Sequence, residues 1–360
     1  MRLPLPPDPA QKSSGRGMTR RVALRGLASC GGVVLLPRVG AASHHGDSVR
    51  YPACQAFIRG FVDRKALAGA LAAIGKAQER AAFLGAGAQS LDAPTPVSAD
   101  SLWRLYSMTK PITGIAAMVL IDERRMKLDQ PIADFIPAFS RMQVLESPDG
   151  PLSDVHPAKR QITVRQLLTH TSGLTYNAMQ TGPIKRAYEE AGIIPALASR
   201  HAIPDFPLLA AAPDLATYAD RLASLPLVHE PGTHWNYSVS FDLLGRLIEV
   251  ASGQRLESFM KARIFQPLGM TSTWFRVPAS EAHRLTSTYA ISEGKLEPID
   301  SANRSIYLDP PPLVLGGAGL VSSARDYDRF LMMLLGEGQA AGVRILRPET
   351  ARLAMSNLID

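Results

Sequence analysis

Apolar residues recur along the chain at two different spacings, and each spacing predicts one type of secondary structure. Over residues 108–125 they follow the i, i+3, i+4 order of a helix with one buried face, at Ile112, Ile115, Ala116, Val119 and Leu120. The same order predicts a helix from Phe241 to Ala251, which Gly253 ends. A third helix is expected over residues 324–335.

Shorter apolar stretches predict two strand pairs, one toward each end of the chain. Residues 69–74 and 81–86 flank the polar residues 76–80, as in a hairpin. A second pair is expected within residues 287–299, with its turn at 292–294. Strands near both ends with helices between them predict an α/β (α+β) fold. Its antiparallel sheet is flanked by helices and built from both ends of the chain, and it carries an all-helical insert.

The expected domain boundaries follow from this order of elements. Residues 42–110 and 250–360 form the discontinuous sheet domain, and residues 111–249 form the helical domain. A chain of 360 residues is long enough for one large domain or two closely joined ones. With 46% hydrophobic and 20% charged residues, its composition excludes a disordered, collagen-like or coiled-coil protein.

The net charge of +7 lies almost wholly at the N-terminus. Residues 1–41 hold seven of the 39 basic and one of the 32 acidic residues, so residues 42–360 hold 32 basic and 31 acidic residues, a net of +1. No basic surface therefore remains for a nucleic acid partner.

The first 41 residues have the layout of a signal peptide. Basic residues precede the apolar run 26–36, small residues end at Ala41, and the pair Arg20 and Arg21 makes the leader twin-arginine-like. We expect an exported protein, periplasmic or secreted, that starts at Met1 or Met18. The apolar run of about 11 residues is too short for a permanent membrane span. An arginine-rich N-terminus of a cytoplasmic protein is the alternative.

Cysteine and histidine usage argues against a metal site or a disulfide. Cys30 lies in the leader, which leaves Cys54 as the only cysteine of residues 42–360. Four histidines lack the spacing of a zinc site, namely His44, His45, His229 and His234. We expect no metal and no organic cofactor.

The sharpest candidate for chemistry is the motif S-M-T-K, from Ser107 to Lys110. A serine hydroxyl needs a base within hydrogen-bond reach, and three residues along a helix bring Lys110 onto the same face as Ser107. A helix that starts near Met108 tolerates Pro111 in its first turn. It places Ser107 at a helix N-terminus, where the dipole favours an alkoxide. A buried Lys110 would have a lowered pKa and act as a base.

The S-x-x-K pattern alone is weak evidence of a catalytic serine, because two other stretches match it. They are S-F-M-K from Ser258 to Lys261, inside an amphipathic run, and S-E-G-K from Ser292 to Lys295, in a polar turn. We expect both to be structural, since the first has no free helix terminus and the second lies at a turn.

Further stretches match one family in order along the chain. They are L-W-R-L-Y-S-M-T-K-P-I-T-G from Leu102, M-K-L-D-Q-P-I from Met126, I-T-V-R-Q-L-L-T-H-T-S-G-L from Ile162, P-G-T-H-W-N-Y-S from Pro231, L-L-G-R-L-I-E from Leu243, P-L-G-M from Pro267 and G-G-A-G-L from Gly316. In these stretches the chain resembles the serine β-lactamase and penicillin-binding-protein superfamily, in the class C-like branch that includes family VIII carboxylesterases and related acyltransferases. The resemblance implies a β-lactamase/transpeptidase-like fold.

The resemblance also implies roles for three residues. Ser107 would be the acylated nucleophile, Lys110 its partner, and Tyr237 the phenolic base that exchanges protons with the serine and the leaving group. Tyr237 follows the turn at residues 231–232 and precedes a helix, so its ring can project from a loop into a cleft. A free phenol titrates near pH 10, and nearby positive groups would lower that pKa. His170 is expected to be structural, and Trp235 and Trp274 to be core residues.

Two departures from the family pattern bear on function. Val239 stands where the second motif often has asparagine, which favours an esterase over an enzyme that grips an amide. The third motif, which supplies one donor of the oxyanion hole, is absent after Gly316. We therefore expect a chain truncated at its C-terminus, with weak or no activity of its own, because losing one such donor costs about 100-fold or more in rate.

The expected function is that of a serine hydrolase that forms an acyl-serine intermediate, most simply a carboxylesterase on small esters. A β-lactamase or D-alanyl-D-alanine carboxypeptidase is the first alternative, and a non-catalytic binding relative is the second. The expected partner is a small-molecule ester or amide. Acyl and alcohol specificity and oligomeric state are left open.

Overall fold

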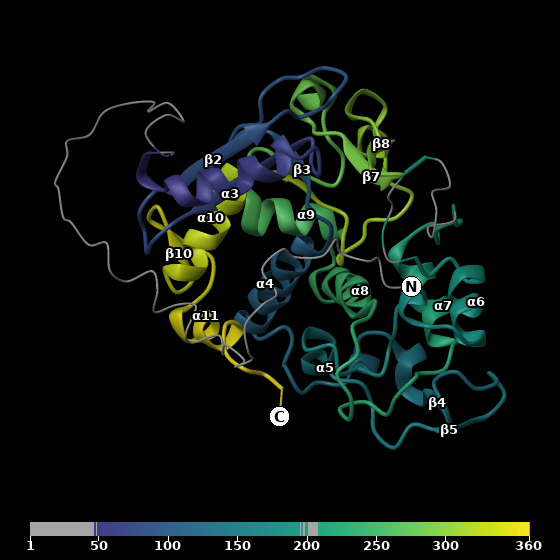
Figure 1. The fold of residues 1–360 in the computed structure, drawn as a ribbon. Coiled ribbons are helices and arrows are strands. Elements are labelled where there is room, and N and C mark those ends of the chain that lie inside the picture. Colours follow the sequence, from purple (N-terminus) through teal and green to yellow (C-terminus); the bar gives the residue numbers. More distant parts are fainter. Residues whose placement is uncertain (1–46, 48, 195, 197–198, 201–207, 360) are drawn as a thin grey trace, which may run out of the picture. The chain divides into compact units, whose positions relative to one another are not determined.

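Both strand pairs expected from the apolar spacing are present in the computed structural model, which describes residues 47, 49–194, 196, 199–200 and 208–359 (Figure 1). β1 (Gly69–Ile74) pairs antiparallel with β2 (Ala82–Gly87). β7 (Thr288–Ser292) pairs antiparallel with β8 (Lys295–Asp300). The expected signal peptide, residues 1–41, lies outside the described residues.

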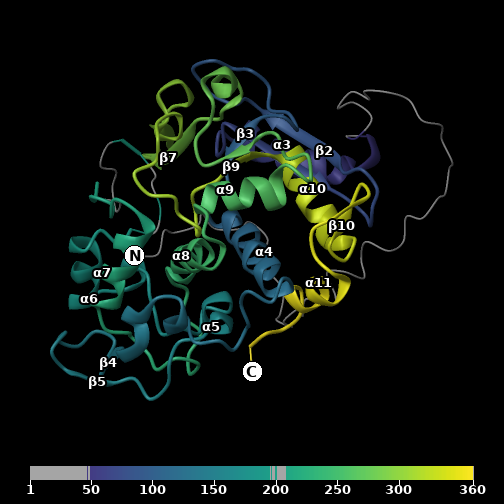
Figure 2. The same cartoon turned by 180° about the vertical axis from the view of Figure 1, so that it is seen from behind.

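The three helices expected from the 3.6-residue spacing are α4 (Thr109–Asp122), α8 (Ser240–Ser252) and α10 (Ala324–Leu335). Gly253 ends α8 in the left-handed region, at φ 69°, a conformation that glycine adopts without steric cost. The expected single buried face of α4 is wrong. Residues on every side of α4 are buried, because the helix packs against α8, α9 (Leu256–Met260) and α11 (Pro348–Ala354), as both views show (Figures 1 and 2).

Segments far apart in the sequence form the sheet next to the N-terminus of α4. β9 (Val321–Ser323) is the middle strand, paired antiparallel with β3 (Leu102–Arg104) on one side and β6 (Thr273–Trp274) on the other. The β1–β2 hairpin and the β7–β8 hairpin are separate two-stranded sheets. A sheet built from early and late segments was expected, but it is divided into several small sheets in the described residues.

The insert is not all-helical, as was expected. It contains α5 (Val164–Leu168), α6 (Pro183–Glu190) and α7 (Leu215–Ala223), but also the antiparallel pair β4 (Gln143–Leu145) and β5 (Val155–Pro157). Backbone hydrogen bonds from Leu145 N–H to Leu227 O and from Leu227 N–H to Gln143 O, 2.9 and 2.8 Å long, hold β4 extended. The boundaries placed at residues 110 and 249 stay a prediction.

Helix α3 (Pro52–Asp63) carries Cys54 as a free thiol. It packs against β1 and β2. Across the described ranges, no helix combines the length and the apolar character needed to cross a bilayer.

A buried ion pair fixes β3, the strand that leads to Ser107. The Arg104 guanidinium donates from Nε to Asp300 Oδ2 over 2.8 Å, and the two side chains are only 2% and 1% exposed. Arg104 also donates to Ser305 Oγ, 2.9 Å away. Each charge is therefore satisfied without water, and removing one partner leaves the other charge buried and unpaired.

We therefore predict that Asp300→Asn lowers the free energy of unfolding by about 3–5 kcal/mol, because the Arg104 charge stays buried without its counterion. The matched control is Asp129→Asn, since Asp129 pairs with Arg165 but is 71% exposed. It should change stability by less than about 1 kcal/mol. Urea unfolding of the three proteins measures both values, and equal losses in the two variants would contradict the prediction.

Candidate active site

The backbone turns sharply between β3 and α4, and Ser107 lies at this turn. Tyr106 has φ 42°, in the left-handed region that a bulky residue seldom adopts. Residues 106–108 form one 3₁₀ turn, and α4 begins at Thr109, one residue later than the sequence suggested. The N–H of Leu105 donates to Leu320 O over 2.8 Å and anchors the turn. Ser107 is thus at the N-terminal end of α4, as expected.

The structure brings the three predicted residues together. Lys110 Nζ donates a hydrogen bond to Ser107 Oγ over 3.2 Å, and Tyr237 OH donates to the same oxygen over 2.8 Å. Ser107 is exposed, whereas Lys110 is buried. An accessible hydroxyl thus has two groups able to carry protons within hydrogen-bond reach, although Tyr237 is 130 residues away in sequence.

Lys110 has further contacts that hold its ammonium group in place. Nζ donates to the carbonyl oxygen of Gly317 over 2.9 Å. It also lies 4.7 Å from the centre of the Tyr237 ring, where the negative face of the ring attracts a cation. These contacts replace the water that a buried ammonium would otherwise need.

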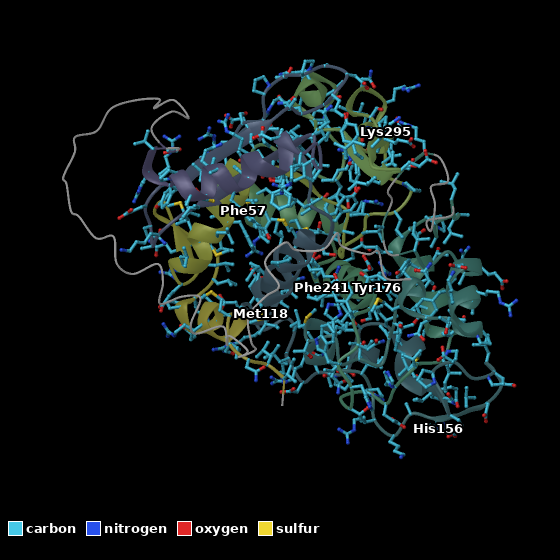
Figure 3. The ribbon with its side chains drawn as sticks, viewed as in Figure 1. Phe57, Met118, His156, Tyr176, Phe241 and Lys295 are labelled. Atoms are coloured by element: carbon cyan, nitrogen blue, oxygen red, sulfur yellow. The ribbon has the colours of Figure 1, made fainter. Side chains whose placement is uncertain are left out.

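Aromatic rings surround Tyr237 and fix its position. The ring centroids of His170, Tyr176 and Trp235 lie 4.6, 5.2 and 6.3 Å from that of Tyr237. Figure 3 labels Tyr176, which contacts Tyr237, and Phe241, which contacts His170. Burial raises the pKa of Tyr176, so that side chain stays a neutral phenol.

His170 supports this aromatic group, in agreement with the structural role expected of it. Its Nδ1 accepts the N–H of Ser238 over 3.2 Å, and its ring packs on Phe241 at 5.2 Å. Burial, together with the charge of Lys110, lowers the pKa of His170 to about 4. The ring is therefore neutral at pH 7, with its proton on Nε2, because Nδ1 accepts a hydrogen bond.

The expectation that both tryptophans lie in the core is wrong for Trp235, which is 61% exposed. Its loop follows Gly232, at φ 81°, and turns the indole outward beside Tyr237. Trp274 is half-buried and packs against the small cluster that includes Leu102 and Val321.

Ser258 lies in the first turn of α9, which begins at Leu256, so the expectation that no helix terminus lies near it is wrong. Ser292 lies at the turn, as expected, and faces Lys295 across the first step of the β7–β8 hairpin.

Val239 is fully buried in the main core at the N-terminus of α8. Its side chain packs there with other apolar residues, so position 239 contributes to the stability of α8. Asn236 instead supplies an amide near the site, and its Nδ2 donates to Leu174 O over 2.8 Å.

Sequence reasoning missed Asp242, which the structure connects to the site through Gly317. The carboxylate oxygen Oδ1 of Asp242 accepts the N–H of Gly317 over 2.8 Å. An acidic residue between the apolar residues of an otherwise buried helix, and the paired glycines of G-G-A-G-L, were the available signals.

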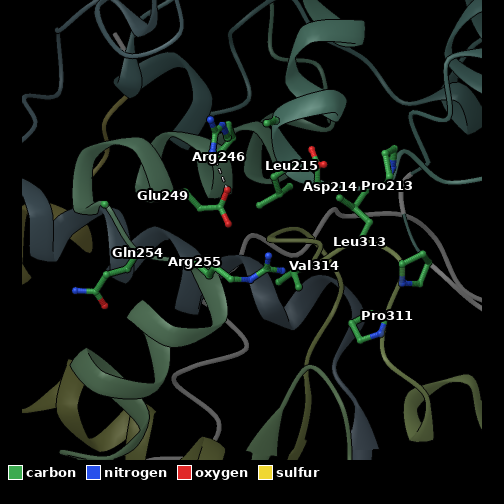
Figure 4. Close-up of a pocket in the computed structure, with 13 residues that line it drawn as sticks. Pro213, Asp214, Leu215, Arg246, Glu249, Gln254, Arg255, Pro311, Leu313 and Val314 are labelled. Atoms are coloured by element: carbon green, nitrogen blue, oxygen red, sulfur yellow. Dashed lines mark hydrogen bonds and ion pairs between the residues drawn. The ribbon is translucent and has the colours of Figure 1, made fainter.

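A separate cavity of about 380 Å³ lies between α7, α8 and the segment after Pro310 (Figure 4). Its lining includes Asp214 and Pro311 and the ion pair of Arg246 with Glu249, whose atoms are 3.1 Å apart, but none of the three predicted site residues. Within the ranges that the structure describes, no group of three His, Cys, Asp or Glu side chains is arranged to hold a metal.

Comparison with known proteins gives one family. The family model described as Beta-lactamase matches residues 54–357. The chain is 38% identical over 299 residues to Protein Rv1367c of Mycobacterium tuberculosis, which covers 83% of this chain and 70% of that protein. It is also 32% identical over 283 residues to Esterase EstB of Burkholderia gladioli, and this match covers 74% of this chain and 65% of EstB.

Among solved structures, EstCE1, described as a hydrolase with promiscuous acyltransferase activity, matches with a TM-score of 0.68. At 24% sequence identity the match covers 86% of this chain and 77% of EstCE1, and it bears on the fold alone. Together with the family match, it confirms the expected fold in its coarse form.

We predict that His170 makes the protein sensitive to acid. The pKa of His170 is about 4 when folded and about 6.5 when unfolded, so the unfolded chain binds a proton first as the pH falls. Stability should therefore fall by about 3 kcal/mol between pH 6.5 and pH 4 through this residue. His170→Asn should lose this pH dependence, because asparagine does not titrate. The substitution should fit, because asparagine tolerates φ 58° and its oxygen can accept the Ser238 N–H.

Urea unfolding at several pH values, with the two proteins compared at each, measures the difference. The other titrating groups cancel in that difference, including Asp242, whose raised pKa acts with the opposite sign. Parallel curves for the two proteins would show that His170 does not titrate as described.

Proposed function

The chain belongs to the Beta-lactamase family, and we propose that it is a serine hydrolase that forms an acyl-enzyme on Ser107, acting as a carboxylesterase on small esters. One observation carries the proposal. The exposed Ser107 Oγ accepts hydrogen bonds from both Lys110 Nζ and Tyr237 OH, at 3.2 and 2.8 Å. Nucleophilic catalysis by serine needs a group within hydrogen-bond reach that can take the serine proton, and both side chains lie within that reach.

In the proposed reaction, Tyr237 first releases its phenolic proton to solvent. Its oxygen then takes the proton of Ser107 Oγ as Ser107 attacks the ester carbonyl carbon. The Lys110 ammonium, close to the Tyr237 ring, stabilises that phenolate. The tetrahedral intermediate then expels the alcohol, which takes the proton from Tyr237. Water then attacks the carbonyl carbon of the acyl-serine and loses a proton to the Tyr237 oxygen. When the carboxylic acid leaves, the Ser107 oxygen takes that proton back from Tyr237. The N-terminal dipole of α4 favours negative charge beside Ser107 throughout.

Esters are preferred over lactams for two reasons. EstB, which is similar over most of this chain, is named an esterase. Position 239 is valine, which offers no amide to hold a lactam or peptide bond. A β-lactamase or D-alanyl-D-alanine carboxypeptidase is the alternative within the same family, and a non-catalytic binding relative is the alternative outside enzymes.

Export through the twin-arginine-like leader is also part of the proposal. It rests on the residue pattern of positions 1–41 alone. Fractionation of expressing cells would test it, because a protein found only in the cytoplasm would contradict export.

We predict that any ester hydrolysis by this chain, however slow, depends on Ser107. Ser107→Ala should lose all turnover of a short-chain nitrophenyl ester above background. Tyr237→Phe should lower kcat/KM by about 100- to 10,000-fold, the usual value of a general base. Ser258→Ala is the matched control and should keep the parent rate, since Ser258 lies inside α9.

Two other outcomes would change the assignment. Equal residual hydrolysis by the parent and by Ser107→Ala would favour the non-catalytic relative. Faster turnover of a chromogenic cephalosporin than of the ester would favour the β-lactamase or peptidase.

We further predict that Trp235 contacts the substrate, because its exposed indole lies 6.3 Å, between ring centroids, from the Tyr237 ring. Covering this ring with an apolar acyl chain would remove both surfaces from water. Trp235→Ala should then raise KM about 10-fold more for a nitrophenyl butyrate than for the acetate. Steady-state kinetics with both esters give this ratio, and an unchanged ratio would place Trp235 outside the substrate site.

A further inference from the structure

Asp242 is a carboxylate in the first turn of α8 with no exposed surface. Burying a carboxylate is costly unless its oxygens are hydrogen-bonded. Oδ1 accepts the Gly317 N–H over 2.8 Å, whereas Oδ2 has no hydrogen-bond partner within the described part of the chain. Burial raises the pKa of Asp242 to about 7, and the Gly317 hydrogen bond and the charge of Lys110 act against that rise. The fold keeps a costly group here, and its hydrogen bond to Gly317 leads toward the site.

The peptide group that joins Gly316 to Gly317 is held at both ends. Its carbonyl oxygen accepts the hydroxyl of Thr113, on α4, over 2.6 Å. Its N–H donates to Asp242, on α8. The next carbonyl, that of Gly317, accepts Lys110 Nζ over 2.9 Å. The orientation of this carbonyl therefore depends on a peptide group clamped between the two helices.

Neither Gly316 nor Gly317 has room for a side chain. A Cβ atom on Gly317 would lie 2.9 Å from both carboxylate oxygens of Asp242. A Cβ atom on Gly316 would lie 2.5 Å from the carbonyl oxygen of Phe241. Both distances are closer than real Cβ contacts, so the two glycines allow the backbone to approach α8.

We propose that Asp242 is a positioning residue for Lys110. By accepting the Gly317 N–H, it orients the Gly317 carbonyl, which in turn holds Lys110 Nζ 3.2 Å from Ser107 Oγ. Asp242 touches no reacting atom and acts only through Gly317. The inference rests on the proposed function, because the position of Lys110 affects the rate only if Ser107 is the nucleophile.

The test compares the rate at which a fluorophosphonate probe labels Ser107 in the full chain, in four single variants and in one double variant. Asp242→Ala removes the acceptor and should slow labelling about 100-fold, the usual cost of a small misplacement of a reacting group. Asp242→Asn keeps an acceptor oxygen without the charge, and should stay within about fivefold of the parent. The matched control is Asp326→Asn, because Asp326 is an equally buried carboxylate whose hydrogen bonds go to Ser272, Thr273 and Arg329.

The fourth variant, Gly317→Ala, disturbs the hydrogen bond between Gly317 and Asp242 through the other partner and keeps the Asp242 charge. It should slow labelling as Asp242→Ala does. The double variant should be no slower than the slower single one, because Asp242→Ala also removes the atoms that the new methyl group would meet. Gly317→Ala and Asp242→Asn keep the test decisive if Asp242→Ala does not fold.

Unchanged labelling rates in Asp242→Ala and Gly317→Ala would overturn the inference. It would also be overturned if Asp242→Asn were labelled as slowly as Asp242→Ala, because the effect would then be due to the charge of Asp242. A parent chain that is never labelled at Ser107 would contradict the proposed function. Hydrogen exchange of the Gly317 amide then decides the inference without activity. Faster exchange in Asp242→Ala than in the parent and in Asp242→Asn would support it, and equal exchange would overturn it.

Discussion

The burial of the Lys110 ammonium is the constraint on which the rest of the site depends. A buried cation must find hydrogen-bond acceptors and favourable charge inside the protein, because it has lost its water. Here the acceptors are Ser107 Oγ and the Gly317 carbonyl, and the Tyr237 ring lies beside them. Satisfying one charge therefore brings the candidate nucleophile, the candidate base and the glycine loop to a single point.

The fold meets this constraint with segments that are distant in sequence. β3 and the turn at Tyr106 deliver Ser107, and the buried pair of Arg104 and Asp300 anchors that strand. The N-terminus of α8 delivers Tyr237 and Asp242, while the segment before β9 brings Gly317 against α4. Rings from the insert then pack around Tyr237, so its hydroxyl is held in place by contacts on several sides.

Local sequence patterns predicted the elements well but not the way in which they pack. The spacing of Ile112 to Leu120 predicted the helix correctly. It could not show that α4 is buried on every side, because that burial depends on helices far away in the sequence. The pair β4–β5 was missed because a strand of three residues has almost no periodicity of its own. Long-range contacts, rather than local preference, keep it extended.

The same distinction applies to the site. Ser107 and Lys110 are one helical turn apart, so their contact follows from the sequence, whereas the contact of Tyr237 with Ser107 was expected only from the family resemblance. Asp242 was missed because its role depends on a backbone N–H 75 residues away, which no residue pattern reveals. Peptide mapping after treatment with a fluorophosphonate probe shows directly whether Ser107 is the nucleophile. We expect one adduct, on Ser107, which Ser107→Ala abolishes. An adduct on another serine, or an equal yield from Ser107→Ala, would contradict it.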